Sequence, residues 1–586
     1  MSLAPMKIHS KLHTAKNCQP KYKTTVKDKN GKEVVCADPR ATRALVALMD
    51  LGAVNGGAAC HWGGPAAAAE MASAIHAKMF ETADWRKSYN FVNDIGHAEN
   101  GIYALRANLG FGGLSIEDLK GFRSIDSFLT GHGESHLYPE GVLLSNGPLS
   151  SALPQAQGLC MADKLTGNDR VTVCMVSDGA SMEGEAKEAF AAIPGLAKKG
   201  KMNPFVMVVS DNNTKLSGRI EADSYDMQPT FEAMQALGWN TIRVDKGNDL
   251  QSCYRSFEEA LEQGQKGPVF IWLKTVKGFG VKSTEESASG GHGFPIKAHS
   301  KDIYPFLEEV LEGDIPAELK HWADELTKEE TKEPEAKEKK ADSIKKEKTQ
   351  AGLARGALKA AKEGRPVVSV SCDLQGSTGM AAFHKEFPER SFDIGIAESN
   401  MVSVAAGMSK AGYIPVVDTF AAFGITKGNL PLVMAALSEA PLIAVFSHTG
   451  FQDAADGASH QSLTYISAVS SIPHTKVVIP ATSQEAEELM GQAINEIEFA
   501  RLEGRSAASY IFFVGRENFP VKLEGMGRSE LGKAQTLAKG KDALLVASGP
   551  MVYQALRAKE MLKDNGYEVG VINSHSVNFP DLETIG

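Results

Sequence analysis

The chain has 586 residues, of which 43% are hydrophobic and 23% charged, a composition typical of a globular protein with about three domains. Its formal net charge of −10 argues against nucleic-acid binding, and no apolar run reaches the ~18 residues that a membrane span needs. The N-terminus lacks the apolar core of a signal peptide, and the seven cysteines show no CxxC spacing. We therefore expect a cytoplasmic protein without a membrane partner or a structural zinc site.

The first part of the chain begins with an arm and continues into helical sequence. Residues 1–40 are polar and irregular, and we expect them to form a surface arm. Helical patterning starts at Asp38, and residues 41–325 are expected to form the first domain. Within it, residues 56–80 read GGAACHWGGPAAAAEMASAIHAKMF, a glycine-rich loop that runs into an Ala-rich helix. His61 lies in that loop, just before a helix N-terminus suited to anions.

A βαβ unit is predicted at the centre of this domain. Two β-rich runs, 171–176 and 205–210, flank an Ala- and Glu-rich helical segment, a pattern typical of neighbouring strands in a buried parallel sheet. Asp178 follows the first strand and Asn212 the second, so both side chains should emerge at the carboxyl edge of the sheet. A carboxylate, an amide oxygen and a backbone carbonyl form a partial shell for Mg²⁺, which would take its remaining oxygens from water and a diphosphate. Gly179 would let the backbone approach that phosphate, and Asn213 is the alternative amide ligand.

Two other motifs in the first domain do not support a site. His132 and His136, with Glu134 between them, suggest zinc, but they have neither HExxH spacing nor a cysteine partner. Residues 195–202, GLAKKGKM, nearly spell a P-loop. They lack the final hydroxyl residue, and they precede a strand where a P-loop follows one.

The second half of the chain predicts a linker and two further domains. Residues 326–349 are a charge run with no apolar face, which we interpret as a solvated linker. A second domain is expected over 350–525, where a short buried strand leads to Glu398 and a helix rich in small residues. A third domain over 532–586 contains DALLVASGP and YEVGVINSH, read as parallel strands around a helix.

The order strand, Asp-Gly, Glu-bearing helix, strand, Asp-Asn resembles the thiamine-diphosphate binding motif of the transketolase family, with Ser177 in place of a glycine. Further segments are similar to the family's motifs. In chain order, those around His61, His97, His132, Gly147, Glu398 and His448 match "SGHPG", "LSNGHG", "GHPE", "GPLGQG", "GIREHAM" and "HDSIGVGEDGPTHQP". The match to "GPLGQG" fails in its second half, where this chain has Ser150, Ser151 and Ala152 in place of Gly-Gln-Gly. The resemblance runs from about residue 40 to the end and implies the α/β thiamine-diphosphate-binding fold, with two parallel-sheet domains and a short third α/β C-terminal domain. The first domain would bind diphosphate and metal, and the second the pyrimidine ring.

The resemblance also implies roles for individual residues. The metal, Mg²⁺ with Ca²⁺ or Mn²⁺ as possible substitutes, would be held by Asp178, Asn212 and the backbone carbonyl of Thr214. The residues implied in binding thiamine diphosphate are His97, Gly147, Leu149, Asp178, Gly179, Glu183, Asn212, His292, Asp373, Glu398, Phe420 and Phe423. The catalytic residues would be Glu398, His61, His132, His292 and His460. The residues implied in substrate binding are His61, His132, Arg355, Ser377, His448, Asp456, His460 and Arg516.

The implied activity is a reversible transfer of a two-carbon ketol unit. The donor would be a ketose phosphate such as xylulose 5-phosphate and the acceptor an aldose phosphate such as ribose 5-phosphate, through a thiamine diphosphate ylid whose formation Glu398 promotes. The resemblance also implies a homodimer with active sites at the subunit interface. The alternatives are a 1-deoxyxylulose-5-phosphate synthase, an enzyme of the 2-oxo-acid dehydrogenase type, and a cofactor-free scaffold. His61, His132, Asp456 and Arg516 together favour transketolase, and the presence of Asp178 and Glu398 argues against the scaffold.

Overall fold

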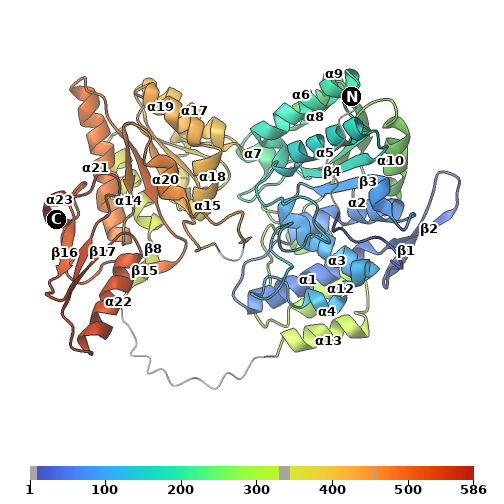
Figure 1. Cartoon of the computed structure of the whole chain (residues 1–586), viewed down its shortest axis with the longest axis horizontal. Helices are drawn as coiled ribbons and strands as arrows, with labels where there is room; N and C mark the ends of the chain where they lie inside the picture. The colour runs from blue at the N-terminus through green and yellow to red at the C-terminus, as the bar shows by residue number, and fades with distance from the viewer. Residues whose placement is uncertain (1–9, 329–343, 454–455, 586) are drawn as a thin grey trace. The chain divides into compact units, whose positions relative to one another are not determined.

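The computed structural model describes residues 10–328, 344–453 and 456–585. The chain divides into two compact units (Figure 1). The first comprises Met1–Lys332 with Ala455–Gly457, and the second Glu333–Ala454 with Ala458–Gly586. Among the described residues, no helix combines the length and the apolar character that crossing a membrane requires.

The first unit is built on a parallel sheet with the strand order β3-β4-β5-β7-β6. Its strands are β3 (Tyr89–Asn93), β4 (Val171–Ser177), β5 (Phe205–Asp211), β6 (Asn240–Val244) and β7 (Val269–Lys274). Every residue of β4 and β5 is buried, and α6 (Gly184–Lys198) connects these two parallel neighbours. The predicted βαβ unit is therefore confirmed.

Helices surround this sheet and form a second apolar core beside it. Besides α6, the long helices of the unit are α1 (Pro39–Asn55), α2 (Gly63–Met79), α3 (Glu99–Leu109), α5 (Ala152–Thr166), α10 (Leu250–Gln263), α12 (Ile303–Leu311) and α13 (Ala317–Leu326). The short ones are α4 (Ile116–Leu119), α7 (Ile220–Asp223), α8 (Gln228–Glu232), α9 (Met234–Leu237) and α11 (Lys282–Glu285). Helix α1 begins after Asp38, whose side chain accepts a hydrogen bond from the backbone N–H of Arg40, as the helical patterning predicted.

The prediction of an irregular surface arm is wrong for much of residues 10–40. Strands β1 (Lys23–Lys27) and β2 (Glu33–Ala37) form an antiparallel hairpin, drawn in blue at the margin of the unit in Figure 1. Leu12 and Val26 are buried in the same core as the central sheet. The arm is therefore part of the packed unit, because its few apolar side chains have a core to enter.

The second unit contains a six-stranded parallel sheet with the order β10-β9-β11-β12-β14-β13. Its strands are β9 (Val367–Ser371), β10 (Ser391–Asp393), β11 (Ile414–Phe420), β12 (Ile443–Ser447), β13 (Thr475–Val478) and β14 (Ser509–Phe513). One apolar core joins the sheet to α14 (Gln350–Lys362), α16 (Ala381–Glu386) and α21 (Ser483–Leu502). A separate core joins it to α17 (Glu398–Lys410), α18 (Ala421–Thr426), α19 (Asn429–Leu437) and α20 (Tyr465–Val469), so helices cover both faces.

Two predictions about this unit need correction. The strand before Glu398 was expected to be buried, but β10 lies at the sheet edge and Phe392 is 42% exposed. Of the expected charged linker, residues 329–343 lie outside the described part of the chain. Lys346–Lys348 are strand β8, paired antiparallel with β15 (Asn518–Pro520), so this end of the predicted linker is ordered.

The C-terminal part forms a small α/β layer. It contains β16 (Gln535–Ala538), β17 (Ala543–Ala547), α22 (Met551–Lys563), β18 (Val569–Asn573) and α23 (Leu582–Ile585). Strands β17 and β18 are parallel and α22 connects them, as predicted, while β16 pairs antiparallel with β18. The predicted fold class, two parallel-sheet domains and a short third α/β domain, is confirmed.

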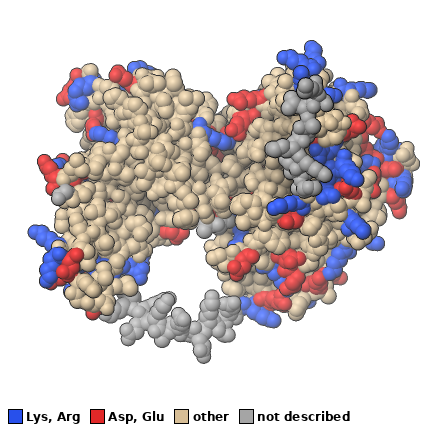
Figure 2. Space-filling view, in the orientation of Figure 1, with Lys and Arg blue, Asp and Glu red and all other residues tan. Residues whose placement is uncertain are grey.

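The charged surface gives no pointer to a site on the face drawn in Figure 2. Acidic and basic side chains lie next to one another, mostly toward the margins, and broad areas between them are uncharged. The buried polar groups at the ends of the parallel strands are therefore the stronger candidates for a site.

Candidate functional site

The carboxyl edge of β4 and β5 holds a buried carboxylate. Ser177 and Ser210 are partners in the ladder, so Asp178 and Asn212 follow adjacent strands. Asp178 is 1% exposed, and its carboxylate accepts hydrogen bonds from the backbone N–H groups of Gly179 (2.9 Å), Asn212 (2.8 Å) and Asn213 (2.7 Å). Glu183 is also buried here, at the N-cap of α6. The loops after both strands are thus tied together around one acid.

Burial makes this acid a weak one. Desolvation, followed by the nearby charge of Asp211, raises the pKa of Asp178 to about 7. Asp211 itself pairs with the Lys274 ammonium at 2.5 Å and accepts a hydrogen bond from the Trp272 indole at 2.6 Å. A divalent cation beside Asp178 would restore its ionised form, so the edge is suited to a metal.

The next residues add oxygen atoms and a cation. The Oδ1 atom of Asn212 accepts a hydrogen bond from the Thr214 backbone at 3.1 Å. The Lys277 ammonium lies 3.3 Å from the Thr214 carbonyl oxygen and 2.9 Å from His292 Nδ1. Asn213 takes a left-handed conformation (φ 54°), and its side-chain oxygen accepts a hydrogen bond from the backbone of Glu221. The amide of Asn213 is therefore engaged with α7.

Four of the predicted histidines form one cluster in the first unit. The His61 ring lies 5.1 Å from the His292 ring and 5.8 Å from those of His97 and His132, measured between ring centroids. His97 and His292 are 5.4 Å apart. Burial lowers the pKa of His61 and of His292 well below the ordinary value, and it also lowers that of His132. These three rings are therefore neutral near pH 7.

Glycines allow the loops to approach the cluster. A Cβ atom at Gly64, in the first turn of α2, would lie 2.6 Å from the His97 ring. A Cβ atom at Gly96 would lie 2.2 Å from the Asn146 carbonyl oxygen and 3.1 Å from that of Gly147. The loop that carries Gly147 and Leu149 therefore packs directly against the His97 segment, and larger residues would separate them.

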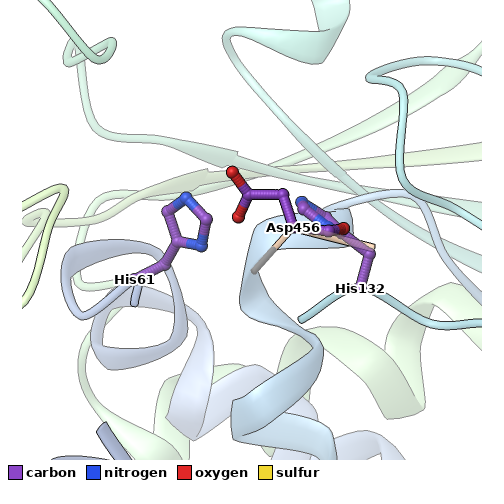
Figure 3. A group of neighbouring side chains, drawn as sticks. All are labelled: His61, His132 and Asp456. Atoms are coloured by element: carbon purple, nitrogen blue, oxygen red, sulfur yellow. The ribbon is translucent and has the colours of Figure 1, made fainter. Parts of the chain in front are cut away.

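Asp456 joins this cluster, with which it is counted in the first unit (Figure 3). The ligand atoms of His61, His132 and Asp456 lie within 4.8 Å of one another. However, His132 Nδ1 is 2.8 Å from the Asp456 backbone oxygen, and the guanidinium of Arg123 is 3.1 Å from its carboxylate. Because the Arg123 guanidinium lies beside the Asp456 carboxylate, the cluster of His61, His132 and Asp456 is better suited to binding hydroxyl groups than a metal ion.

The second unit brings together the predicted aromatic residues and two histidines. The Phe420 ring stacks on the His448 ring, with centroids 3.9 Å apart, and lies 6.0 Å from Phe423. Phe423 in turn contacts His460 edge-on at 5.1 Å. Phe420 ends β11, so this cluster lies at the carboxyl edge of the second sheet. Such an edge is where open parallel sheets bind ligands.

Glu398 and Asp373 also follow strands of this sheet. Glu398 is the first residue of α17 and is 3% exposed, and its Oε2 atom has no hydrogen-bond partner among the described residues. Asp373 follows β9 and, like His448, has a left-handed backbone, with φ of 67° and 61° respectively. Unfavourable backbone conformations persist where the surroundings fix them, and they concentrate at functional sites.

The predicted phosphate contacts fall into two places. Arg355 and Ser377 line one pocket of about 300 Å³ together with Lys348. Arg355 also pairs there with Glu347 and Glu487. Arg516 instead pairs at 2.5 Å with Asp453, which is fully buried. No described contact joins Arg516 to that pocket.

Two residues in the first unit were missed by the sequence reasoning. Lys277 lies beside the Thr214 carbonyl, one of the predicted metal ligands. The sequence feature that could have indicated it is its position next to Gly278, at the start of the glycine-rich loop that ends in His292. Arg123 contacts both His61 and Asp456. Nothing in the sequence around Arg123 distinguishes it from a surface arginine.

Comparisons with known proteins find relatives of this chain. The family described as the transketolase thiamine diphosphate binding domain matches residues 39–361, the transketolase pyrimidine binding domain matches 346–502, and the transketolase C-terminal domain matches 532–586. The human transketolase-like protein 2 is 30% identical over 536 residues, covering 88% of this chain and 81% of that protein. The transketolase of Streptococcus pyogenes is 27% identical over 605 residues, covering 92% and 79%. A crystal structure of transketolase from Campylobacter jejuni is 22% identical over 92% of this chain and 88% of that one, with a TM-score of 0.40.

Proposed function

Since the chain belongs to the transketolase family, we propose that it transfers a two-carbon ketol unit from a ketose phosphate to an aldose phosphate with thiamine diphosphate and Mg²⁺. The observation that carries the proposal is the cluster of His61, His97, His132 and His292 in the unit that also carries Asp178. Four imidazoles in contact provide many hydrogen-bonding atoms for the hydroxyl groups of a sugar. A decarboxylating enzyme of the same fold has no need of so many.

The residues present fit the metal and the diphosphate. Asp178 is a buried carboxylate whose pKa burial raises, so a cation would stabilise its charged form. Asn212 and the Thr214 carbonyl would complete the protein ligands, with Asn213 as the alternative amide, since each amide oxygen accepts one backbone hydrogen bond. The Lys277 ammonium, adjacent to the Thr214 carbonyl, would neutralise the diphosphate.

In the second unit, the stacked rings of Phe420 and Phe423 would hold the aminopyrimidine ring. Thiamine diphosphate, when bound, supplies the electron sink that cleavage of a carbon–carbon bond next to a carbonyl requires. Glu398 would hold a proton at its buried Oε2 and hydrogen-bond the ring of the cofactor, since this atom has no other partner among the described residues. Gly147 and Leu149 would contact the same ring through backbone groups.

Other residues would bind and orient the sugars. His61, His132 and Asp456 would hold hydroxyl groups near the reacting carbons, and His460 would move protons there. Arg355 and Ser377 line a pocket open to a phosphate group. Arg516 and His448 are the remaining proposed substrate contacts. Residues 41–325 would thus serve the diphosphate end and residues 350–525 the pyrimidine ring.

We further propose a homodimer in which the two units that form one active site come from different subunits. Helix α19 supports this proposal, because Leu430, Met434 and Leu437 lie on one of its faces and are 69%, 51% and 68% exposed. Exposed apolar faces of this kind mark interaction sites. The cytoplasm is the proposed compartment, because seven free cysteines suit reducing surroundings.

Two parallel assays test the proposed activity. Purified protein with thiamine diphosphate and Mg²⁺ is given xylulose 5-phosphate and ribose 5-phosphate in one mixture, and pyruvate and glyceraldehyde 3-phosphate in the other. We expect two-carbon transfer in the first mixture only. Product in the second alone would assign the protein to the synthases, and a failure of calorimetry to detect cofactor binding would support the scaffold alternative.

A further inference from the structure

Arg123 contacts both His61 and the loop that carries it. Its Nη2 atom is 3.3 Å from His61 Nδ1, and its Nη1 atom donates a hydrogen bond of 2.6 Å to the Ala59 carbonyl oxygen. The side chain is 1% exposed. Arg123 thus contacts both the backbone of the loop before α2 and the His61 ring on that loop.

The chemistry of this contact determines where the His61 proton lies. A guanidinium group has only donors and stays protonated in proteins, so it cannot accept a hydrogen bond from an imidazole N–H. His61 Nδ1 must therefore be the acceptor, which places the single proton of the neutral ring on Nε2. The opposite tautomer would set an N–H against an N–H at this contact.

The charged and titratable groups around His61 favour the same neutral form. Those acting on it are Asp456, Arg123, His97 and His132, with His292 in ring contact. Of these only Asp456 favours a protonated ring, and its carboxylate is already paired with Arg123 at 3.1 Å. The guanidinium therefore opposes a second proton on His61 both directly and through its pairing with the acid.

The backbone around Arg123 is built to hold this position. Arg123 has a left-handed conformation with φ of 60°, which is costly for a residue with a side chain, and its N–H donates to the Leu129 carbonyl oxygen at 3.0 Å. Asp50 is fully buried nearby, and the charge of Arg123 lowers its pKa, although burial raises that pKa well above its ordinary value.

We propose that Arg123 is a positioning residue that fixes His61 as the tautomer with its proton on Nε2, so that His61 acts as a hydrogen-bond donor to substrate oxygen and not as a base. The consequence for substrate rests on the proposed function, whereas the tautomer does not. The loop keeps a second anchor without Arg123, because Asn100 donates to the His61 carbonyl oxygen at 2.8 Å. Replacing Arg123 should therefore change the proton position more than the place of the ring.

Solid-state NMR of the full chain labelled with ¹⁵N-histidine tests the tautomer without substrate. The His61 signals are assigned by their absence in His61→Gln. We expect the wild-type Nδ1 to resonate as an unprotonated nitrogen from pH 6 to pH 9. Arg123→Met should add a population protonated at Nδ1, while Arg123→Lys, which keeps a donor-only cation, should retain the wild-type spectrum. A protonated Nδ1 in the wild type would overturn the proposal, whatever the spectra of Arg123→Met and Arg123→Lys show.

Kinetics then connect the tautomer to the reaction. In Arg123→Met we expect kcat/KM to fall more than about tenfold and to acquire a new dependence on pH, with the loss largely reversed in Arg123→Lys. Equal losses and unchanged pH profiles in both variants would reduce Arg123 to a structural role. If the NMR result stands and no ketol transfer occurs in the wild type, the proposed function fails and the tautomer assignment survives.

Discussion

Glu398 is the residue on which the proposed chemistry depends most directly. The Glu398→Gln variant keeps the size and polarity of the side chain but replaces the carboxyl group by an amide. The Oε2 atom of that carboxyl group is buried and has no hydrogen-bond partner among the described residues. We expect thiamine diphosphate to bind with nearly unchanged affinity and kcat to fall by about 10² or more. Calorimetry and a single-turnover assay measure the two quantities.

The matched control is Glu389→Gln, which changes a glutamate in the same unit whose side chain is 64% exposed. This variant should leave both binding and turnover as they are. Near-normal turnover in Glu398→Gln would remove Glu398 from the proposed mechanism. A loss of cofactor binding alone would instead make it a binding residue.

Asp418, at the end of β11, predicts a dependence of stability on pH. It accepts hydrogen bonds from Thr378 (2.6 Å) and Ser371 (3.0 Å), yet burial, the largest effect, raises its pKa to about 7. Between the unfolded value near 3.8 and that pKa, the folded state binds more protons than the unfolded state, so stability falls as the pH rises. The stability of Asp418→Asn relative to wild type should therefore increase as the pH rises, by on the order of 2 kcal/mol from pH 5 to pH 8.

Hydrogen exchange of peptides from β11 and β12 in urea at both pH values measures this difference for the second unit. Asp564→Asn, at an exposed position after α22, is the control and should show the same stability change at each pH. A relative stability of Asp418→Asn that does not increase with pH would show that the Asp418 carboxylate is accommodated as an anion.

At the scale of elements, the sequence predicted what strong local patterns specify. Continuous apolar runs located β4 and β5, and the parallel pairing followed from the helical segment between them. The β1–β2 hairpin was missed although Asn30-Gly31, a common hairpin turn signal, lies between its strands. Strand β1 reads KTTVK and is mostly polar, and β2 reads EVVCA without alternation, so the hydrophobic alternation of the pair was too weak to recognise.

The site was predictable where it follows strand ends and unpredictable where it depends on loops meeting in space. Asp178 and Asn212 follow neighbouring strands, and the sheet edge brings them together. Arg123 lies 62 residues from His61, and its contact depends on a loop with a left-handed backbone that no local pattern indicates. Lys277, in contrast, had a local signal, because it lies next to Gly278 at the start of a glycine-rich loop.

The loop before α5 makes a prediction about stability. Ser150 is fully buried with φ of 65°, and its hydroxyl has no hydrogen-bond partner among the described residues. Its backbone N–H donates to Asp94, which also accepts from Ala152 and so holds the strained conformation in place. Ser150→Gly should stabilise the first unit by about 1 kcal/mol, because relief of backbone strain and of the buried hydroxyl exceeds the added entropy of the unfolded chain.

Thermal and urea unfolding of the first unit measure this gain. The neighbouring Ser151→Gly is the control, since Ser151 has an ordinary φ of −77° and donates a hydrogen bond of 2.6 Å to the Pro148 carbonyl oxygen. That change should destabilise the protein. If Ser150→Gly also destabilises it, the left-handed conformation is not a source of strain.

At the scale of the whole molecule, the proposed site divides its residues between two units. Asp178 and the histidine cluster belong to the first unit, and Glu398 and the aromatic residues to the second. A chain that supplies both halves can complete a site with itself or with a second copy. The exposed apolar face of α19 favours assembly with a second copy.

Mixing two inactive variants distinguishes these arrangements. Asp178→Asn damages only the first unit and Glu398→Gln only the second, so each homodimer should be inactive. If sites form between subunits, a mixed dimer has one site with both defects and one with neither. Random exchange at equal concentrations makes half of the dimers mixed, so about one quarter of the wild-type activity should return. If each site were completed within one chain, mixing would restore nothing, even in a mixture that native mass spectrometry shows to contain mixed dimers.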